Sequence, residues 1–147
     1  MLGAPVEGYN HTSAAINRFT VNGAGGPNIG PYQGGGKQVC CGVLPRHWRP
    51  AFKAIVEWEK DPVPRAYVNW PPLGTAAYRG AYKKHAANYT RHRVMVEVPQ
   101  YQEAGTLKVH FLPCDQVRVS ADNIFYGVPG YPYNFPRKME DTECPTP

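Results

Sequence analysis

The chain has 147 residues and a mass of 16.3 kDa, which is the size of one domain with a buried core. Its 16 prolines and 15 glycines are too few for a collagen-like or wholly disordered chain, and no apolar run is long enough to cross a bilayer. The net charge of +5 comes from residues 75–96, whose only charged side chains are Arg79, Lys83, Lys84, Arg91 and Arg93.

The first part of the chain is typical of short strands separated by turns. Residues 6–12 and 16–22 mix polar and apolar side chains, and their closeness in sequence predicts a hairpin within one sheet. Half of residues 23–36 are glycine, which favours a long loop. Residues 38–44 form a predicted third strand that Pro45 ends, because proline has no N–H for a strand ladder.

Residues 51–59 are the clearest predicted strand, since apolar side chains recur there at every second position. Four prolines in residues 61–72 exclude a central strand and place that segment on the surface or along an edge. Tyrosines and a histidine at spacings of three and four predict one short helix within residues 75–89. Residues 94–98 and 107–112 then form a second predicted hairpin.

A last strand around Val117 and Val119 precedes a proline-rich tail that begins at about residue 127 and is expected to be irregular. Contacts of its aromatic residues or a bridge from Cys144 would fix that tail to the domain. The chain therefore predicts one mainly β domain over residues 1–147, built as a compact antiparallel sheet or sandwich with one short helix.

The four cysteines allow two disulfides. Cys40 and Cys41 are neighbours in a strand and should point to opposite faces, which disfavours a bond between them. If a bridge forms, we expect it to join one of these two, Cys41 in our assignment, to Cys114 at the end of another strand. Buried free thiols are an equal alternative.

No catalytic signature stands out in the chain. The five histidines have no metal-binding helical spacing, the cysteines have no zinc spacing, and neither a G-x-S-x-G elbow nor a phosphate-binding P-loop is present. His11 lies between Asn10 and Thr12, a context typical of a hydrogen-bonded structural residue. We therefore predict no enzyme activity, no catalytic residue, no metal and no cofactor.

Two groups of side chains are the predicted contacts for a protein partner. The first lies in the proline-rich segment and consists of Arg65, Tyr67 and Trp70, while the basic residues Arg79, Lys83 and Lys84 form the second. Aromatic and arginine side chains dominate the energetics of protein interfaces. For Trp70 an alternative is that it anchors its own loop to the domain.

Several stretches of the chain resemble a family of small Gram-negative lipoproteins with a domain of unknown function, which act in type VI secretion as immunity proteins against lipase effectors. The matching stretches are Gly8-Tyr9-Asn10-His11-Thr12, residues 19–26, Gly34-Gly35-Gly36 with Val39-Cys40-Cys41, Leu44-Pro45 with Trp48-Arg49-Pro50 and, more weakly, residues 109–113.

This resemblance implies a periplasmic protein, lipid-anchored in its native form, that binds and inhibits a secreted phospholipase effector. The first residues have neither a signal-peptide pattern nor the lipid-bearing cysteine, so we expect either a cytosolic protein or a mature form without its anchor. For this function we expect no nucleic acid partner. A binding module for an anionic polymer or nucleic acid, acting through the basic stripe of residues 75–96, is the alternative function.

Overall fold

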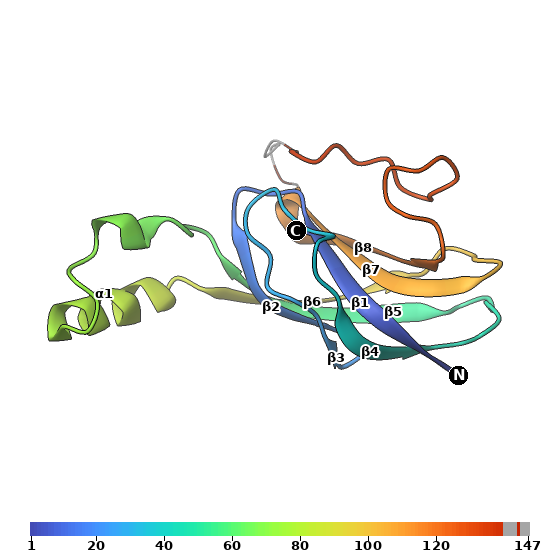
Figure 1. Cartoon of the computed structure of the whole chain (residues 1–147), viewed down its shortest axis with the longest axis horizontal. Coiled ribbons are helices and arrows are strands. Elements are labelled where there is room, and N and C mark those ends of the chain that lie inside the picture. The colour runs from blue at the N-terminus through green and yellow to red at the C-terminus, as the bar shows by residue number, and fades with distance from the viewer. Residues whose placement is uncertain (140–143, 145–147) are drawn as a thin grey trace.

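The computed structural model describes residues 1–139 and residue 144, and within them the chain forms a β sandwich with one projecting helical arm (Figure 1). Sheet A has the strand order β4-β1-β7-β8 and sheet B the order β3-β2-β5-β6. The strands are β1 Leu2–Asn10, β2 Ala15–Val21, β3 Ala24–Gly25, β4 Val39–Leu44, β5 Lys53–Asp61, β6 Thr90–Glu97, β7 Ala104–Leu112 and β8 Gln116–Asp122. The helices are η1 Ala66–Asn69, α1 Ala76–Ala86 and η2 Pro113–Asp115.

The core lies between the two sheets, where the alternation along each strand places apolar side chains. Val6 in β1, Val109 in β7 and Val119 in β8 line it from sheet A. Val56 and Trp58 in β5 line it from sheet B, as the period of two in residues 51–59 predicts. The mainly β fold class with one short helix is therefore confirmed, and the sandwich is the form it takes.

The predicted hairpin of residues 6–12 and 16–22 is wrong, because β1 belongs to sheet A and β2 to sheet B. Asn10 explains the crossing: its side-chain amide donates to the carbonyls of Ala14 at 2.7 Å and Gly30 at 3.0 Å, and its carbonyl oxygen accepts from Thr12. These bonds stabilise a corner that carries the chain to the other sheet instead of a tight hairpin turn.

The second predicted hairpin is wrong for a related reason, since β6 lies in sheet B and β7 in sheet A. The segment between them is fixed by buried contacts: the Trp48 indole donates to the carbonyl of Val98 at 2.9 Å, and the Tyr101 hydroxyl donates to that of Pro45 at 2.5 Å. In sheet A, β7 pairs instead with β1 in parallel, from Val6 opposite Leu107 to Asn10 opposite Phe111.

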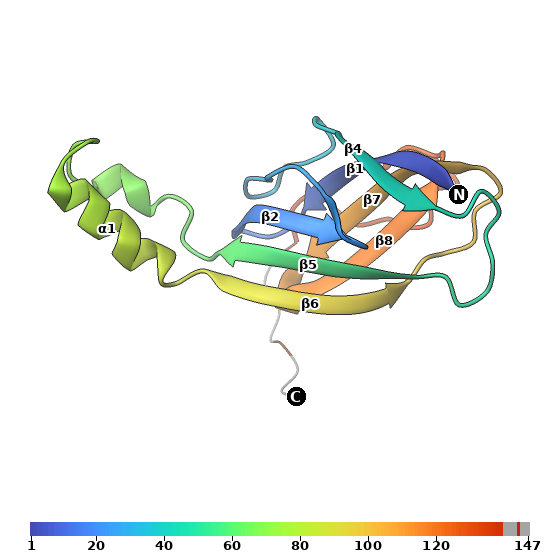
Figure 2. The same cartoon turned by 90° about the horizontal axis from the view of Figure 1, so that it is seen from below.

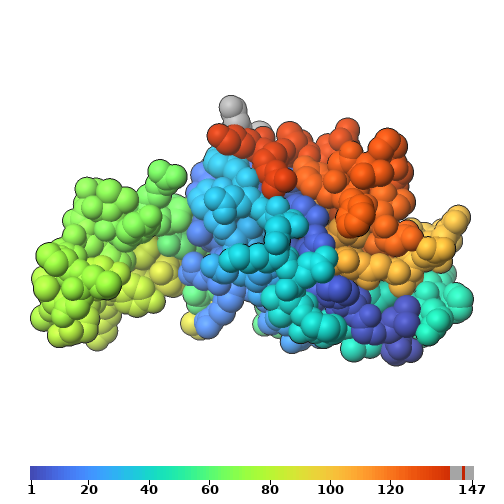
Figure 3. Space-filling view, in the orientation of Figure 1, coloured from blue at the N-terminus to red at the C-terminus, as the bar shows by residue number. Residues whose placement is uncertain are grey.

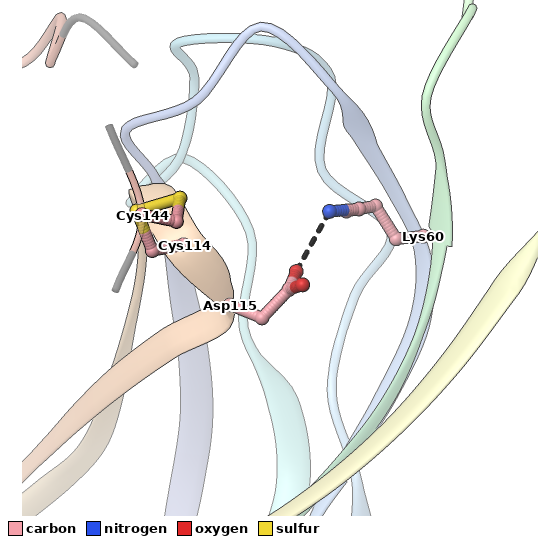
Figure 4. The surroundings of a disulfide bond; sticks show 4 residues. All are labelled: Lys60, Cys114, Asp115 and Cys144. Carbon is pink, nitrogen blue, oxygen red and sulfur yellow. Dashed lines mark hydrogen bonds and ion pairs between the residues drawn. A yellow bond between two sulfur atoms is a disulfide. The ribbon is translucent and has the colours of Figure 1, made fainter. Parts of the chain in front are cut away.

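The disulfides correct the expected Cys41–Cys114 bridge. Cys114 bonds to Cys144, with their Cα atoms 5.4 Å apart (Figure 4). Cys40 bonds to Cys41, the pairing that the sequence disfavours. In the antiparallel β1–β4 pair, Cys41 lies beside the beginning of β1, whereas Cys114 follows the end of β7, which is level with the end of β1. Cys41 and Cys114 therefore lie toward opposite ends of sheet A, beyond the reach of a disulfide.

The C-terminal strap, which we define as residues 124–138, lies over the outer face of sheet A, opposite the core (Figures 1 and 3). It has no helix or strand, as predicted for the tail, and aromatic side chains fix it. The Tyr131 hydroxyl contacts Ser120 in β8 at 2.8 Å and that of Tyr133 donates to the carbonyl of Val119 at 2.9 Å. The rest of the predicted tail, apart from Met139 and Cys144, lies outside the described residues.

Candidate interaction site

The arm comprises residues 62–89, which leave sheet B at the end of β5 and return at the start of β6 (Figure 2). Lys60 opposite Thr90 is the last pair of the β5–β6 ladder. Beyond it the chain forms η1 and α1, which project away from the sandwich. Thr75 caps α1, because its side-chain oxygen accepts from the N–H of Tyr78 at 3.1 Å.

A small aromatic cluster stabilises the arm. The half-buried ring of Trp70 contacts those of Tyr78, Tyr82 and His85, with centroids 5.3, 6.1 and 5.2 Å away. His85 is itself buried and joins the arm to β5 through a 2.9 Å contact between its Nε2 and the Asp61 carboxylate. Trp70 thus anchors its own segment, but to α1 instead of to a sheet.

The arm exposes several large apolar side chains. Leu73 is 81 % exposed, Val68 66 %, Tyr67 61 % and Tyr82 50 %. Single exposed apolar residues are ordinary on protein surfaces, but several on one projecting element mark a contact surface. Since Trp70 already orders the arm, a partner that covers these side chains would lose little binding energy to conformational entropy.

The arm also carries positive charge that no acidic residue of the arm neutralises. Residues 62–89 contain no Asp or Glu, and no ion pair to another described residue involves Arg65, Arg79, Lys83 or Lys84. The basic stripe predicted for residues 75–96 is therefore divided in two. Its β6 arginines face acidic residues of β5, Arg91 contacting Glu59 at 3.3 Å and Arg93 contacting Glu57 at 3.9 Å.

The structure places all six predicted contact residues on the arm. Arg65, Tyr67, Arg79, Lys83 and Lys84 are exposed, and only Trp70 is turned inward. The sequence reasoning missed the two most exposed apolar side chains of the arm, at positions 68 and 73. The two prolines that precede position 73 signal that it lies on the surface.

A second unusual cluster lies under the C-terminal strap. His11 Nδ1 lies 2.8 Å from the carbonyl of Pro136, its Nε2 lies 2.9 Å from His110 Nδ1, and His110 Nε2 lies 2.6 Å from the Tyr131 hydroxyl. A carbonyl only accepts, so His11 Nδ1 donates and its Nε2, in the neutral ring, accepts from His110 Nδ1–H. His110 Nε2 then accepts from Tyr131, whose oxygen accepts from Ser120.

Burial keeps this histidine chain neutral. Desolvation lowers the pKa of His110 to about 3, with smaller contributions from His11 and Lys108, and also lowers the pKa of His11. Burial likewise raises the pKa of Tyr133 to about 12. His11 and His110 are no more than 1 % exposed, so this cluster is covered from solvent, and what it does in the folded protein is hold the strap to sheet A.

Charged side chains beside the histidine chain are paired. Glu7 accepts from the Tyr9 hydroxyl at 2.7 Å and from Gln38 at 2.5 Å. The Lys108 ammonium donates to the carbonyl of Asp122 at 2.7 Å and lies 3.5 Å from its carboxylate. Within residues 1–139 and 144, no three His, Cys, Asp or Glu residues form a group that could hold a metal ion. No helix in that part of the chain is long and apolar enough to span a bilayer.

Comparison with known proteins gives one family match. The family model described as protein of unknown function, DUF3304, matches residues 9–119, which include the arm and the whole of strands β2 to β7, but only the end of β1 and the first part of β8. No curated protein and no solved structure matches the chain significantly. The matched stretch ends before the C-terminal strap.

Proposed function

The chain belongs to the DUF3304 family of proteins of unknown function, and we propose that it acts by binding another protein through its arm. In this proposal the arm contacts the partner and the sandwich holds the arm in place. The proposal rests on two features that coincide on one ordered projection: exposed apolar side chains, and basic side chains that form no ion pair with any other residue among 1–139 and 144. Both kinds of group are left for a partner to satisfy.

The partner that we propose is a secreted phospholipase effector of a type VI system, with this chain as its periplasmic immunity protein. The sequence resemblance to immunity lipoproteins supports this choice, and so does the kind of surface: an inhibitor needs shape and affinity and no reactive group of its own. A nanomolar complex corresponds to about −12 kcal/mol and usually buries about 800 Å² on each partner, which a domain of this size can supply.

The test is co-expression of the chain with a type VI phospholipase effector of the same bacterium, followed by co-purification and a phospholipase assay. Our proposal predicts a stable complex and loss of lipid hydrolysis at equimolar amounts. The arm variant Tyr67→Ala/Leu73→Asp should restore hydrolysis, whereas the matched variant Val43→Asp, at an exposed apolar position of β4, should inhibit like the wild type. Undiminished hydrolysis in the wild-type mixture would refute the immunity function.

The unpaired cations of the arm also support the second candidate, a binding module for an anionic polymer. That function predicts affinity for single-stranded DNA or heparin that falls steeply with salt, because phosphate or sulfate contacts release counterions. The exposed leucine and valine of the arm have no role in such binding, and the pairing of Arg91 and Arg93 with glutamates removes two cations from the stripe. We therefore rank this function second.

A further inference from the structure

We infer that the tip of the arm is a plug, which inserts Leu73 into an apolar recess of the partner while acidic residues at the rim of that recess pair with the cations of α1. This inference rests on the proposed function, because it describes the partner's side of the same contact. It goes further in stating what chemistry the partner must present: an apolar depression bordered by carboxylates.

The geometry of the tip favours insertion. Leu73 is the most exposed large apolar residue of the described chain. Pro71 and Pro72 restrict the backbone before it, and Gly74, at a φ of +88°, turns the chain into α1. The Thr75 hydroxyl closes this turn by donating to the Pro72 carbonyl at 2.7 Å. A leucine on such a fixed turn can be buried at a low entropic cost, provided that the partner offers an apolar cavity.

The positive charges of α1 indicate which charge the rim of the partner's recess must carry. Arg79 and Lys83 are four residues apart and therefore on one side of the helix, and Lys84 follows directly. All three are exposed, and no described carboxylate pairs with them. The carboxylate nearest the root of the arm, that of Asp61, contacts His85 instead. Complementary charges across the interface must therefore come from the partner.

The mixture of side chains favours a protein surface over a phosphate polymer. Leu73 and the other exposed apolar residues of the arm, Tyr67 and Val68, gain binding energy only where apolar surface is removed from water. Phosphate groups of nucleic acids would pair with the cations but leave these side chains exposed. An anionic lipid surface could receive both kinds of group, so lipid binding has to be one outcome of the test.

The experiment measures the association and dissociation rates of the purified chain with the phospholipase. Leu73→Asp should weaken affinity by about thirtyfold or more, mainly through faster dissociation, as for a buried hot spot. Lys83→Glu/Lys84→Glu should slow association by about tenfold or more, and high salt should remove most of that difference. The matched controls Val43→Asp and Lys37→Glu/Lys53→Glu place the same changes on exposed positions outside the arm.

Three outcomes would overturn the plug. If the wild type binds the phospholipase and the arm variants bind it equally well, inhibition of the phospholipase stands, but the contact does not lie on the arm and the plug is refuted. Wild-type binding to vesicles of phosphatidylglycerol and phosphatidylcholine that Lys83→Glu/Lys84→Glu abolishes would assign the arm to a lipid surface. If the wild type does not bind the phospholipase at all, both the function and the plug fall.

Discussion

His11 Nε2 accepts a hydrogen bond of 2.9 Å from His110 Nδ1, within a fully buried layer between sheet A and the C-terminal strap. The pair is the centre of a chain of bonds that runs from Ser120 through Tyr131 to the carbonyl of Pro136. Each acceptor in the chain is matched by one donor only while both imidazoles are neutral. The attachment of the strap therefore depends on the protonation state of two histidines.

Acid should weaken the fold through this pair. An unfolded histidine has a pKa of about 6.5, whereas burial lowers that of His110 to about 3, so the unfolded chain binds more protons between these values. The contribution of His110 to the free energy of unfolding is complete above about pH 6.5 and decreases as the pH falls, by about 2 kcal/mol at pH 5. Urea unfolding measured between about pH 7.5 and 5 checks this.

The matched variants are His110→Phe and His47→Gln. The first should be less stable at neutral pH, because His11 and Tyr131 lose a partner, but its stability should change less with pH. The second removes an exposed histidine and should keep the wild-type pH dependence. A wild-type stability that does not change over this range would refute neutral burial of the pair.

Gly34→Ala should be strongly destabilising. Gly34 has a φ of +140°, and a Cβ there would lie 2.3 Å from the carbonyl oxygen of Gly8 in β1. Backbone strain and overlap with backbone atoms should together lower the free energy of unfolding by about 2–4 kcal/mol. Gly36→Ala is the control, since its Cβ would meet no atom within 4 Å. Chemical denaturation that finds equal stability for the two variants would contradict this close approach.

Trp70→Ala should loosen the arm while leaving the sandwich intact. The variant loses the three ring contacts that join Trp70 to α1, which include the one with His85. None of these contacts reaches the core between the sheets. Hydrogen exchange of the α1 amides should accelerate by about tenfold or more, with little change in the strands. Tyr67→Ala, at an exposed site of the same arm, should leave both rates unchanged. Unaltered protection of α1 in Trp70→Ala would mean that the Asp61–His85 contact alone orders the arm.

Cys144→Ala should reduce stability through the unfolded state. The Cys114–Cys144 bond spans 30 residues, and closing a loop of that size removes chain entropy equivalent to about 3–4 kcal/mol. Oxidised wild type and variant can be compared by urea unfolding. The double variant Cys40→Ala/Cys41→Ala is the control, because a bond between adjacent residues closes almost no loop. A larger loss in the control than in Cys144→Ala would contradict this entropic account.

Local patterns predicted the elements well because they depend on neighbouring residues. The period of two in residues 51–59 marked the buried face of β5, and the spacing of aromatic residues in 75–89 marked α1, with its ends shifted by a few residues. The same patterns do not specify which strands pair. Nothing in the alternation of β1 or β6 indicates that the next strand lies in the other sheet.

The burial of side chains under the C-terminal strap could not be predicted from the sequence, for a different reason. Glu7, Lys108 and His110 alternate with apolar residues, as expected of a sheet face that meets water. Here that face is covered by the C-terminal strap, which has no helix or strand, so no local sequence pattern predicts that the face is buried. The exposure of the arm residues was easier to predict, because proline-rich sequence and a run of basic residues already indicate exposed chain.

The parallel pairing of β1 with β7 determines when a nascent chain can complete its fold. β1 begins at Leu2, but its partner β7 begins only at Ala104, so a ribosome must synthesise the whole segment between these two strands before the pair can form. Until then β1 can pair only with β4 in sheet A. A premature stop before residue 104 would therefore release a polypeptide with an unpaired strand edge, which exposes the chain to proteases and to aggregation.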